Sequence, residues 1–331
     1  NKTKENIKES KDANINKSNT IENSQNNEKQ ELLDIKNDYV FKRTFGYKGD
    51  EEVTKVLLRD ILGMKVNEID LDVNPITEKE LMDDKLGIMD IASVVNDNVQ
   101  VDIEMQVVNK NNIEKRIMYY WNAYYQKSIS KGDDYGELKR TIIILIADFE
   151  IKEIEQAKKY FTEWEIREKD YSELILTDVL KICIIELPKY IKYKVNNPNL
   201  NLWTEFLENP EVINMSEKDI ENEKDESIKT TKKAIKQAKD TLEQISKDKH
   251  EQELARLRKK YIMDQNAIQE YGYCQGVEDG KRDGIEIGKN DGIQFEKIET
   301  AKKMLAKKMP IDVIIEITGL SKEEIEDIKK L

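Results

Sequence analysis

The sequence predicts an α/β protein, with helices mixed among strands up to about residue 210 and a mostly α-helical C-terminal region after it. The clearest observation is a pair of short β-patterned runs, 86–95 and 99–108, which a three-residue turn joins. Other apolar runs of strand length alternate with segments of helical periodicity. At 331 residues the chain is long enough for two domains and a substantial core.

The N-terminal part of the chain changes character near residue 30. Residues 1–30 are rich in Asn, Lys, Glu and Ser and have almost no apolar side chains, so we expect a disordered tail. An α/β domain then spans residues 31–210. Its first clear helix is predicted over 50–63, closing at Gly63, and a strand is predicted over 66–75. The apolar face of that helix consists of Val53, Val56, Leu57, Ile61 and Leu62.

The turn between the two β-patterned runs consists of Asn96, Asp97 and Asn98. Asn and Asp tolerate the backbone conformations that a three-residue hairpin loop requires, so the runs should pair antiparallel. This pairing places Asp90 directly opposite Glu104. A one-residue slip would turn the apolar row of the hairpin toward its polar face, which favours the stated register.

Two acidic side chains opposite one another need an explanation, because like charges about 5 Å apart destabilise a hairpin. A divalent cation between Asp90 and Glu104 would remove the repulsion, and carboxylate oxygens suit magnesium or manganese. The alternative is a solvated hairpin face whose acids only keep a sheet edge soluble.

The helix that follows the hairpin is predicted over 112–132 and closes at Gly132. Arg116 and Tyr120 share one face of this helix because they are four residues apart. The apolar side of the helix consists of Ile113, Ile117, Tyr120, Trp121 and Tyr124.

Two strands of the buried type complete the predicted sheet. They lie over 140–149 and 181–190, and Pro188 stops the second one. With the helices between them, these strands give one α/β domain that ends near residue 210.

The C-terminal region is predicted to have three parts. Residues 211–270 are charged and helix-prone with few apolar anchors, so we expect an extended helical connector. Residues 271–296 contain a glycine at every fourth position, which indicates either a close-packed oligomer helix or a flexible, partly helical linker. The glycines are Gly272, Gly276, Gly280, Gly284, Gly288 and Gly292.

Residues 297–331 form the third part, a small helical tail. Pro310 begins one helix, Gly319 ends it, and Ser321 with Glu324 predicts the N-cap of the next. Helix, Gly-Leu-Ser turn and helix are the outline of a helix-turn-helix unit. Its second helix is acidic, which disfavours DNA in the major groove and leaves packing or oligomerisation as an alternative role.

Composition excludes several kinds of catalytic site. The one histidine, His250, lies in a very polar stretch, so Ser-His-Asp triads, Cys-His dyads and His-rich zinc sites lack parts. Cys183 and Cys274 are too few for a disulfide framework, which suits a reducing cytoplasm. Any catalysis must therefore depend on carboxylates, lysines and a metal ion.

Charge and hydropathy limit the partners. The net charge of −12 disfavours nonspecific binding to nucleic acid, so a DNA-binding surface would have to be local. The longest apolar run, 142–147, is far too short to span a membrane, and no secretory signal is visible. We therefore expect a cytoplasmic protein without a membrane partner.

Several ordered motifs resemble one protein family. They are NDYVFKRTFG, DDKLGIMDI, VDIEMQ, KRIMYYWNAYY, KGDDYGELKRTIIILI and IIELPKY, and they cover about residues 34–190. In this order they resemble the bacterial recombination-promoting nuclease and transposase family, which belongs to the wider PD-(D/E)xK nuclease group. The glycine tetrads and the closing TGLS segment are also similar to tails in such proteins.

The resemblance implies a restriction-endonuclease-like core, with a central mixed sheet flanked by helices, and a Mg²⁺-dependent DNA endonuclease activity. Asp90 matches the first acidic position and Glu104 the second, both as metal ligands. The larger group usually has Lys two residues after the second acid, but here Gln106 stands there and would orient the attacking water or the scissile phosphate. Asp102 is expected to be a supporting charge.

The resemblance leaves open which residue supplies the missing positive charge. Lys85, Lys42 and Arg116 are the candidates. Arg116, Tyr120 and Lys127 also belong to a basic and tyrosine-rich stretch that is the best candidate DNA surface. The basic residues of this stretch are Lys110, Lys115, Arg116, Lys127, Lys131, Lys139 and Arg140.

A second hypothesis is a catalytically weak or inactive nuclease-fold module that acts in DNA binding or assembly. The pI near 5.0 and Gln106 favour this hypothesis, whereas the presence of both Asp90 and Glu104 opposes it. In either case the partners would be DNA and other copies of the chain, bound through the C-terminal helical region.

Overall fold

A computed structural model describes residues 31–47, 49, 51–72, 90–109, 112–213 and 215–330. The predicted disordered tail, residues 1–30, lies outside the described residues. The chain forms two compact units, residues 1–260 and 261–331.

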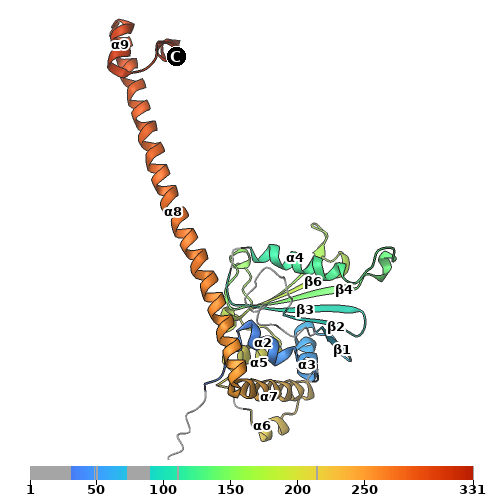
Figure 1. Cartoon of the computed structure of the whole chain (residues 1–331). Coiled ribbons are helices and arrows are strands. Elements are labelled where there is room, and N and C mark those ends of the chain that lie inside the picture. Colours follow the sequence, from blue (N-terminus) through green and yellow to red (C-terminus); the bar gives the residue numbers. More distant parts are fainter. Residues whose placement is uncertain are drawn as a thin grey trace, which may run out of the picture. The chain divides into compact units, whose positions relative to one another are not determined.

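The first unit is built on one six-stranded mixed sheet with the strand order β1-β2-β3-β4-β6-β5 (Figure 1). β3 pairs parallel with β4, and β4 pairs parallel with β6, whereas the other neighbours are antiparallel. The strands are β1 (Ile69–Asp72), β2 (Ile91–Val95), β3 (Val99–Gln106), β4 (Arg140–Ala147), β5 (Phe161–Arg167) and β6 (Ile175–Glu186). The predicted α/β class with a central mixed sheet is confirmed.

Helices cover both faces of this sheet (Figure 1). On one side lie α2 (Asp38–Phe45), α3 (Glu51–Leu62), α5 (Pro198–Glu208) and α7 (Glu226–Lys247), and on the other lies α4 (Ile113–Gln126). Alternation along the strands sends successive side chains to opposite faces. Met105 and Ile144 therefore join the core beneath α2 and α3, while Leu145 packs with Ile117 of α4.

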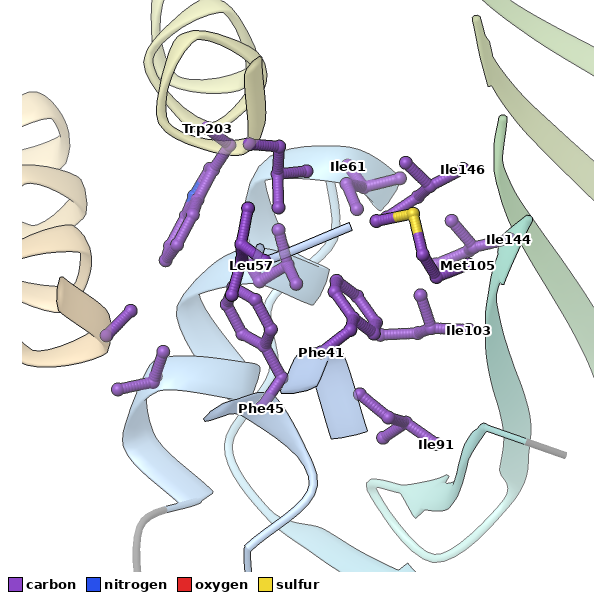
Figure 2. Packing of buried hydrophobic residues seen from close by; sticks show 14 of the residues in the cluster. Phe41, Phe45, Leu57, Ile61, Ile91, Ile103, Met105, Ile144, Ile146 and Trp203 are labelled. Carbon is purple, nitrogen blue, oxygen red and sulfur yellow. The ribbon is translucent and has the colours of Figure 1, made fainter. Parts of the chain in front are cut away.

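The larger core lies between the sheet and α2, α3 and α5. Phe41 and Phe45 of α2 are almost completely buried, and their rings lie 4.8 Å apart between centroids. Trp203 of α5 meets the ring of Phe45 edge-on at 5.9 Å. Figure 2 shows Phe41 next to Ile103 of the central strands, with Phe45 and Trp203 on the side farther from the sheet.

Local sequence explains where the first two helices begin and end. Asn37 caps α2 by accepting hydrogen bonds from the backbone N–H groups of Tyr39 and Val40. Gly63 follows α3 with φ of 63°, the left-handed conformation that glycine adopts readily, as the sequence predicts. β1 confirms the central part of the strand predicted over 66–75, and residues 73–75 lie outside the described residues.

Two predicted elements differ from the structure at their ends. α4 stops at Gln126 rather than near Gly132, because the Ser128 hydroxyl bonds the carbonyl of Tyr125 and accepts from Lys139 N–H instead of continuing the helix. β6 begins at Ile175, six residues before the predicted start. Its partner β5 was not predicted, since its FTEWEIR pattern is polar and largely exposed.

The prediction of an extended connector over 211–270 is wrong for α7. This helix buries Ala234, Ile235, Ala238 and Leu242 in the larger core. The buried carboxylate of Asp60 on α3 also accepts hydrogen bonds from Thr231 of α7 at 2.7 Å and from Trp203 at 2.9 Å. Small residues at helical spacing supply the packing face, which is why the apolar content of the segment is low.

α8 (Lys249–Ala306) includes the whole glycine repeat in helical form. Within the described residues, no atom that could clash lies within 4 Å of a Cβ added at any glycine of the repeat. The single chain therefore shows the predicted helix. It does not show a close packing contact that would offset the free-energy cost of glycines in a helix.

The end of the second unit matches the predicted helix-turn-helix outline. α9 (Ile311–Thr318) ends at Gly319 with φ of 66°, and α10 (Lys322–Lys330) follows. Ser321 and Glu324 bond each other's backbone N–H groups, which is the predicted capping box. A separate small core holds these helices together and includes Ala301, Met304, Ile314, Leu320 and Ile325.

Candidate functional site

The hairpin of β2 and β3 has the predicted register. Ile91 pairs with Ile103 and Val95 pairs with Val99. The turn residues Asn96 and Asp97 have φ of 49° and 65°, the left-handed conformation that Asn and Asp tolerate.

Asp90 lies one residue before β2, where continuation of the register places it opposite Glu104. The Asp90 carboxylate accepts a hydrogen bond from the backbone N–H of Met105 at 2.8 Å. This bond joins Asp90 to the strand that carries Glu104 and fixes one of the two oxygens of Asp90.

The acidic side chains of β3 are buried beneath α4. Asp102 is 0% exposed and Glu104 is 3% exposed. Within the described part of the chain, no N–H or hydroxyl group donates to either buried oxygen of Asp102 or to Oε1 of Glu104, and these two carboxyl groups can bond each other only when one of them carries a proton. Leaving such groups unpaired is costly, so this part of the sheet is not optimised for stability alone.

Burial raises the pKa of Asp90, Asp102 and Glu104 well above the usual carboxyl range, and each acid raises the pKa of a neighbour further. The charge of Glu104 acts on Asp90, that of Asp90 on Asp102, and that of Asp102 on Glu104. The three carboxyl groups thus form one electrostatic cluster, which we call the acidic row.

Three basic side chains lower the pKa values of the acidic row. Lys42 of α2 is buried, and its charge lowers the pKa of Asp90 and of Asp102. Lys127 acts likewise on Asp102, and Arg116 acts on Glu104. Lys85 lies outside the described residues.

Arg116 and Tyr120 of α4 form the predicted pair. An Arg116 Nη atom donates to the Tyr120 hydroxyl at 2.9 Å. The Tyr120 pKa is raised by burial and by the charge of Glu104. Both side chains line a narrow, largely enclosed hollow between α4 and the sheet, together with Glu104, Gln106, Ile113, Ile117, Ile143 and Leu145.

Gln106 lies beside Glu104 on the same face of β3. Its Nε2 donates a hydrogen bond to Glu104 Oε2 at 3.2 Å. The bond leaves Oε1 of Glu104 as the oxygen without a partner. Gln106 therefore orients the second acid of the pair.

The donor set fits a magnesium-type ion. Carboxylates are hard oxygen ligands, and Mg²⁺ is usually held by one or two of them with water and substrate phosphate completing the shell. No cluster of three or more His, Cys, Asp or Glu side chains suited to a metal occurs among the residues that the structure describes. A metal at Asp90 and Glu104 would therefore keep open positions.

Other predicted DNA-contacting residues divide into two groups. Lys115, Lys127 and Lys131 are exposed. Lys139 instead donates to the carbonyl of Asp97 at 2.9 Å and holds the hairpin turn. Lys110 lies outside the described residues.

The roles of two residues near the site were not predicted from the sequence. Asp38 acts on Asp90 electrostatically and raises its pKa. Tyr124, expected only as an apolar residue of α4, donates its hydroxyl to the carbonyl of Ser93 at 2.8 Å and so joins α4 to β2. Both lie in motifs that carry the family resemblance, but no spacing rule distinguishes them there.

No described helix combines the length and the apolar character that crossing a membrane requires.

Comparison with protein-family models gives two matches. Residues 35–272 match the model described as PD-(D/E)XK nuclease family transposase. Residues 294–330 match the model described as Rpn/YhgA-like nuclease family, C-terminal HTH domain. Searches of curated proteins and of solved structures found no match. The nuclease model matches well over half of the 331-residue chain. The chain therefore belongs to the PD-(D/E)XK nuclease family transposases and ends in the HTH domain of Rpn/YhgA-like nucleases.

Proposed function

We propose that this protein is a Mg²⁺-dependent DNA endonuclease that hydrolyses phosphodiester bonds in recombination or transposition, with Mn²⁺ as an alternative ion. The observation that carries the proposal is the acidic row. Asp90, directly before β2, bonds the backbone N–H of Met105 next to Glu104, and Oε1 of Glu104 is buried with no N–H or hydroxyl donor among the described residues. Uncompensated buried carboxylates do not stabilise a hairpin, whereas a bound cation would compensate their negative charge.

Asp90 and Glu104 would hold the ion. When bound, it would supply Lewis-acid chemistry, lowering the pKa of water and neutralising charge on the phosphate. Gln106 would keep Glu104 Oε1 directed toward the ion by binding Oε2. Gln106 cannot accept a proton as a lysine amine can, so it would serve as a positioning residue and not as a general base.

Lys42 would replace the lysine that usually follows the second acid. It is buried, its charge lowers the pKa of two acids of the row, and none of the residues that the structure describes forms an ion pair with its ammonium group. A fixed positive charge at this place would stabilise the negative charge that develops on the phosphate oxygens. Lys85 remains a second candidate for this role.

DNA would approach from the side of α4. Arg116 and Tyr120 line the hollow above Glu104, and Lys127 lies exposed at the end of the same helix. Cations there would bind phosphates and place the scissile bond over the acidic row. The net charge of −12 makes such a local surface necessary, because the chain as a whole repels DNA.

We also place the reaction in the cytoplasm and assign oligomer formation to the C-terminal helical region. Both cysteines are free, which suits a reducing compartment. The glycine repeat of α8 exposes its backbone along one helix, as a second copy of that helix would require for close packing.

The test is plasmid cleavage with Mg²⁺ and with EDTA by the wild-type protein and by Asp90→Ala and Glu104→Ala. Each substitution should lower the cleavage rate by about 10³-fold, since it removes a ligand worth several kcal/mol in the transition state. Glu114→Ala, which removes an exposed acid of α4, is the matched control and should cleave normally. Equal cleavage by all four proteins would reject the site.

A noncatalytic DNA-binding or assembly module is the second candidate. The observation in its favour is Gln106 at the usual lysine position, and the acidic, exposed surface of α10 favours assembly over DNA binding by that helix. DNA binding without cleavage, in Mg²⁺ or Mn²⁺ and for every variant, would support the module over the enzyme.

A further inference from the structure

The N-terminal turns of α8 hold α2 through a set of charged contacts that no predicted role includes. We call this set the α2–α8 clamp. It consists of Asp38, Tyr39 and Arg43 on α2 with Glu251 and Arg258 on α8, all within the first compact unit.

Each contact of the clamp has good geometry. Arg258 donates two hydrogen bonds from different nitrogens to Asp38, at 2.6 Å from Nη2 and at 2.9 Å from Nε. Glu251 accepts from Arg43 at 2.8 Å and from the Tyr39 hydroxyl at 2.6 Å. Paired hydrogen bonds between Arg and a carboxylate fix orientation as well as distance.

The clamp is also shielded from water. The side chains of Arg258 and Asp38 are 15% and 17% exposed. By contrast, Arg256 and Glu253 form an ion pair on the same helix with side chains 62% and 51% exposed. Exposed ion pairs of that kind contribute little to stability, so Arg256 serves as a control residue on the same helix.

Lys42 lies between the points at which the clamp holds α2. Tyr39 precedes it and Arg43 follows it, so the rotation of α2 about its axis determines where the Lys42 ammonium group lies. Phe41 and Phe45 bind α2 to the sheet by apolar packing (Figure 2), which tolerates small rotations better than directed hydrogen bonds do. The clamp therefore adds orientation to a helix that is already docked.

Asp38 gives the clamp a second link to the site. Its charge acts on Asp90, and Arg258 places a compensating charge directly on Asp38. Without Arg258, the Asp38 carboxylate would lose its charged partner and, among the described residues, keep only the hydrogen bond from the backbone N–H of Tyr39 at 2.8 Å.

We propose that Glu251 and Arg258 are positioning residues of the nuclease site, which hold α2 so that the Lys42 side chain stays beside the start of β2, next to Asp90. The expected effect of these residues on DNA cleavage rests on the proposed function. Their expected effect on the position of Lys42 does not. The first turns of α8 thus belong to the catalytic unit and not to a connector.

The first measurement follows Lys42 directly and needs neither metal nor DNA. The metal-free protein is treated with an amine-acetylating reagent, and the rate at Lys42 is read by mass spectrometry. Arg258→Ala and Glu251→Gln should raise this rate about tenfold, because each loses charged hydrogen bonds that keep α2 in place. Arg256→Ala should leave the rate at the wild-type value.

The second measurement is the cleavage rate of the same variants. Arg258→Ala should cleave about tenfold more slowly, as expected for a small misplacement of a catalytic group, with a larger effect on kcat than on KM. Arg258→Lys keeps one charged contact and should recover part of the loss. Arg256→Ala should cleave at the wild-type rate.

The outcomes separate the inference from the proposed function. Acetylation of Lys42 that stays at the wild-type rate in Arg258→Ala and Glu251→Gln, or that rises equally in Arg256→Ala, overturns the inference. A wild-type protein that never cleaves DNA overturns the proposed function but leaves the Lys42 result standing. If thermal unfolding shows that Arg258→Ala does not fold, Arg258→Lys and Tyr39→Phe are judged by the same rates.

Discussion

The two faces of the central sheet are made by alternate residues of the same strands, yet they differ in how their buried atoms are paired. The face under α2, α3 and α5 is apolar and forms one core with Phe41 of α2 and Trp203 of α5. The face under α4 contains Asp102 and Glu104, and within the described residues no N–H or hydroxyl group donates to either oxygen of Asp102 or to Oε1 of Glu104. Buried apolar and buried acidic side chains thus alternate at each residue step along β3.

Phe41→Ala tests the apolar face. Removing this fully buried ring should lower the free energy of unfolding by about 3–5 kcal/mol, through lost burial and the cavity that remains. Denaturant unfolding measures the loss. Tyr135→Ala, at a side chain that is 84% exposed, is the control and should change stability by less than about 0.5 kcal/mol.

The pH dependence of stability tests the acidic face. The pKa values of Asp90, Asp102 and Glu104 are raised in the folded protein, so the folded state binds more protons than the unfolded state above about pH 4. The metal-free protein should therefore lose stability as pH rises from there toward the raised pKa values, by about 1.4 kcal/mol per pH unit for each group that titrates.

Denaturant unfolding at several pH values gives this slope. The variant Asp90→Asn, Asp102→Asn, Glu104→Gln has no such groups and should show a smaller slope over the same range. Identical slopes for the variant and the wild-type protein would show that the acidic row does not titrate differently on folding.

Asp102→Asn sharpens the comparison at one residue. The change replaces a buried carboxyl group, to which no N–H or hydroxyl group of the described residues donates, by an amide of the same shape, so the free energy of unfolding at neutral pH should rise by about 1–2 kcal/mol. Glu114→Gln, at an exposed acid, should leave stability unchanged. A loss of stability in Asp102→Asn would mean that the Asp102 carboxylate is compensated in the native protein.

Gln106→Ala tests the smallest contribution to the acidic face. Loss of the hydrogen bond to Glu104 should slow cleavage by about tenfold, as for supporting residues around metal ligands, with little change in stability. Cleavage assays with Gln126→Ala as the exposed-glutamine control measure the effect. An unchanged rate would remove Gln106 from the site.

The sequence predicted the hairpin well because local rules determine it. Asn96 and Asp97 permit the turn, and alternation allows only one register that buries Ile91 and Ile103. The same rules could not reveal the pairing of Glu104 with α4, since contacts between distant elements leave no periodic signal.

The docking of α7 and the clamp were missed for related reasons. α7 buries alanines such as Ala234 and Ala238, which a count of large apolar residues overlooks. Arg258 and Glu251 look like ordinary surface charges of a polar helix, and only the fold brings them to Asp38 and Arg43. Long-range ion pairs of this kind depend on tertiary structure alone.

Asn96 also affects the order in which the chain assembles. Its side chain accepts hydrogen bonds from the backbone N–H groups of Asn67 and Glu68 and donates to the carbonyl of Lys65, so one turn residue joins the hairpin to the approach of β1. Hairpins close in about 1–10 μs, whereas the parallel pairs β3–β4 and β4–β6 must wait for long crossovers. We expect Asp90 and Glu104 to meet early in folding, and stopped-flow refolding of Asn96→Ala should show a slower folding phase with a nearly unchanged unfolding rate.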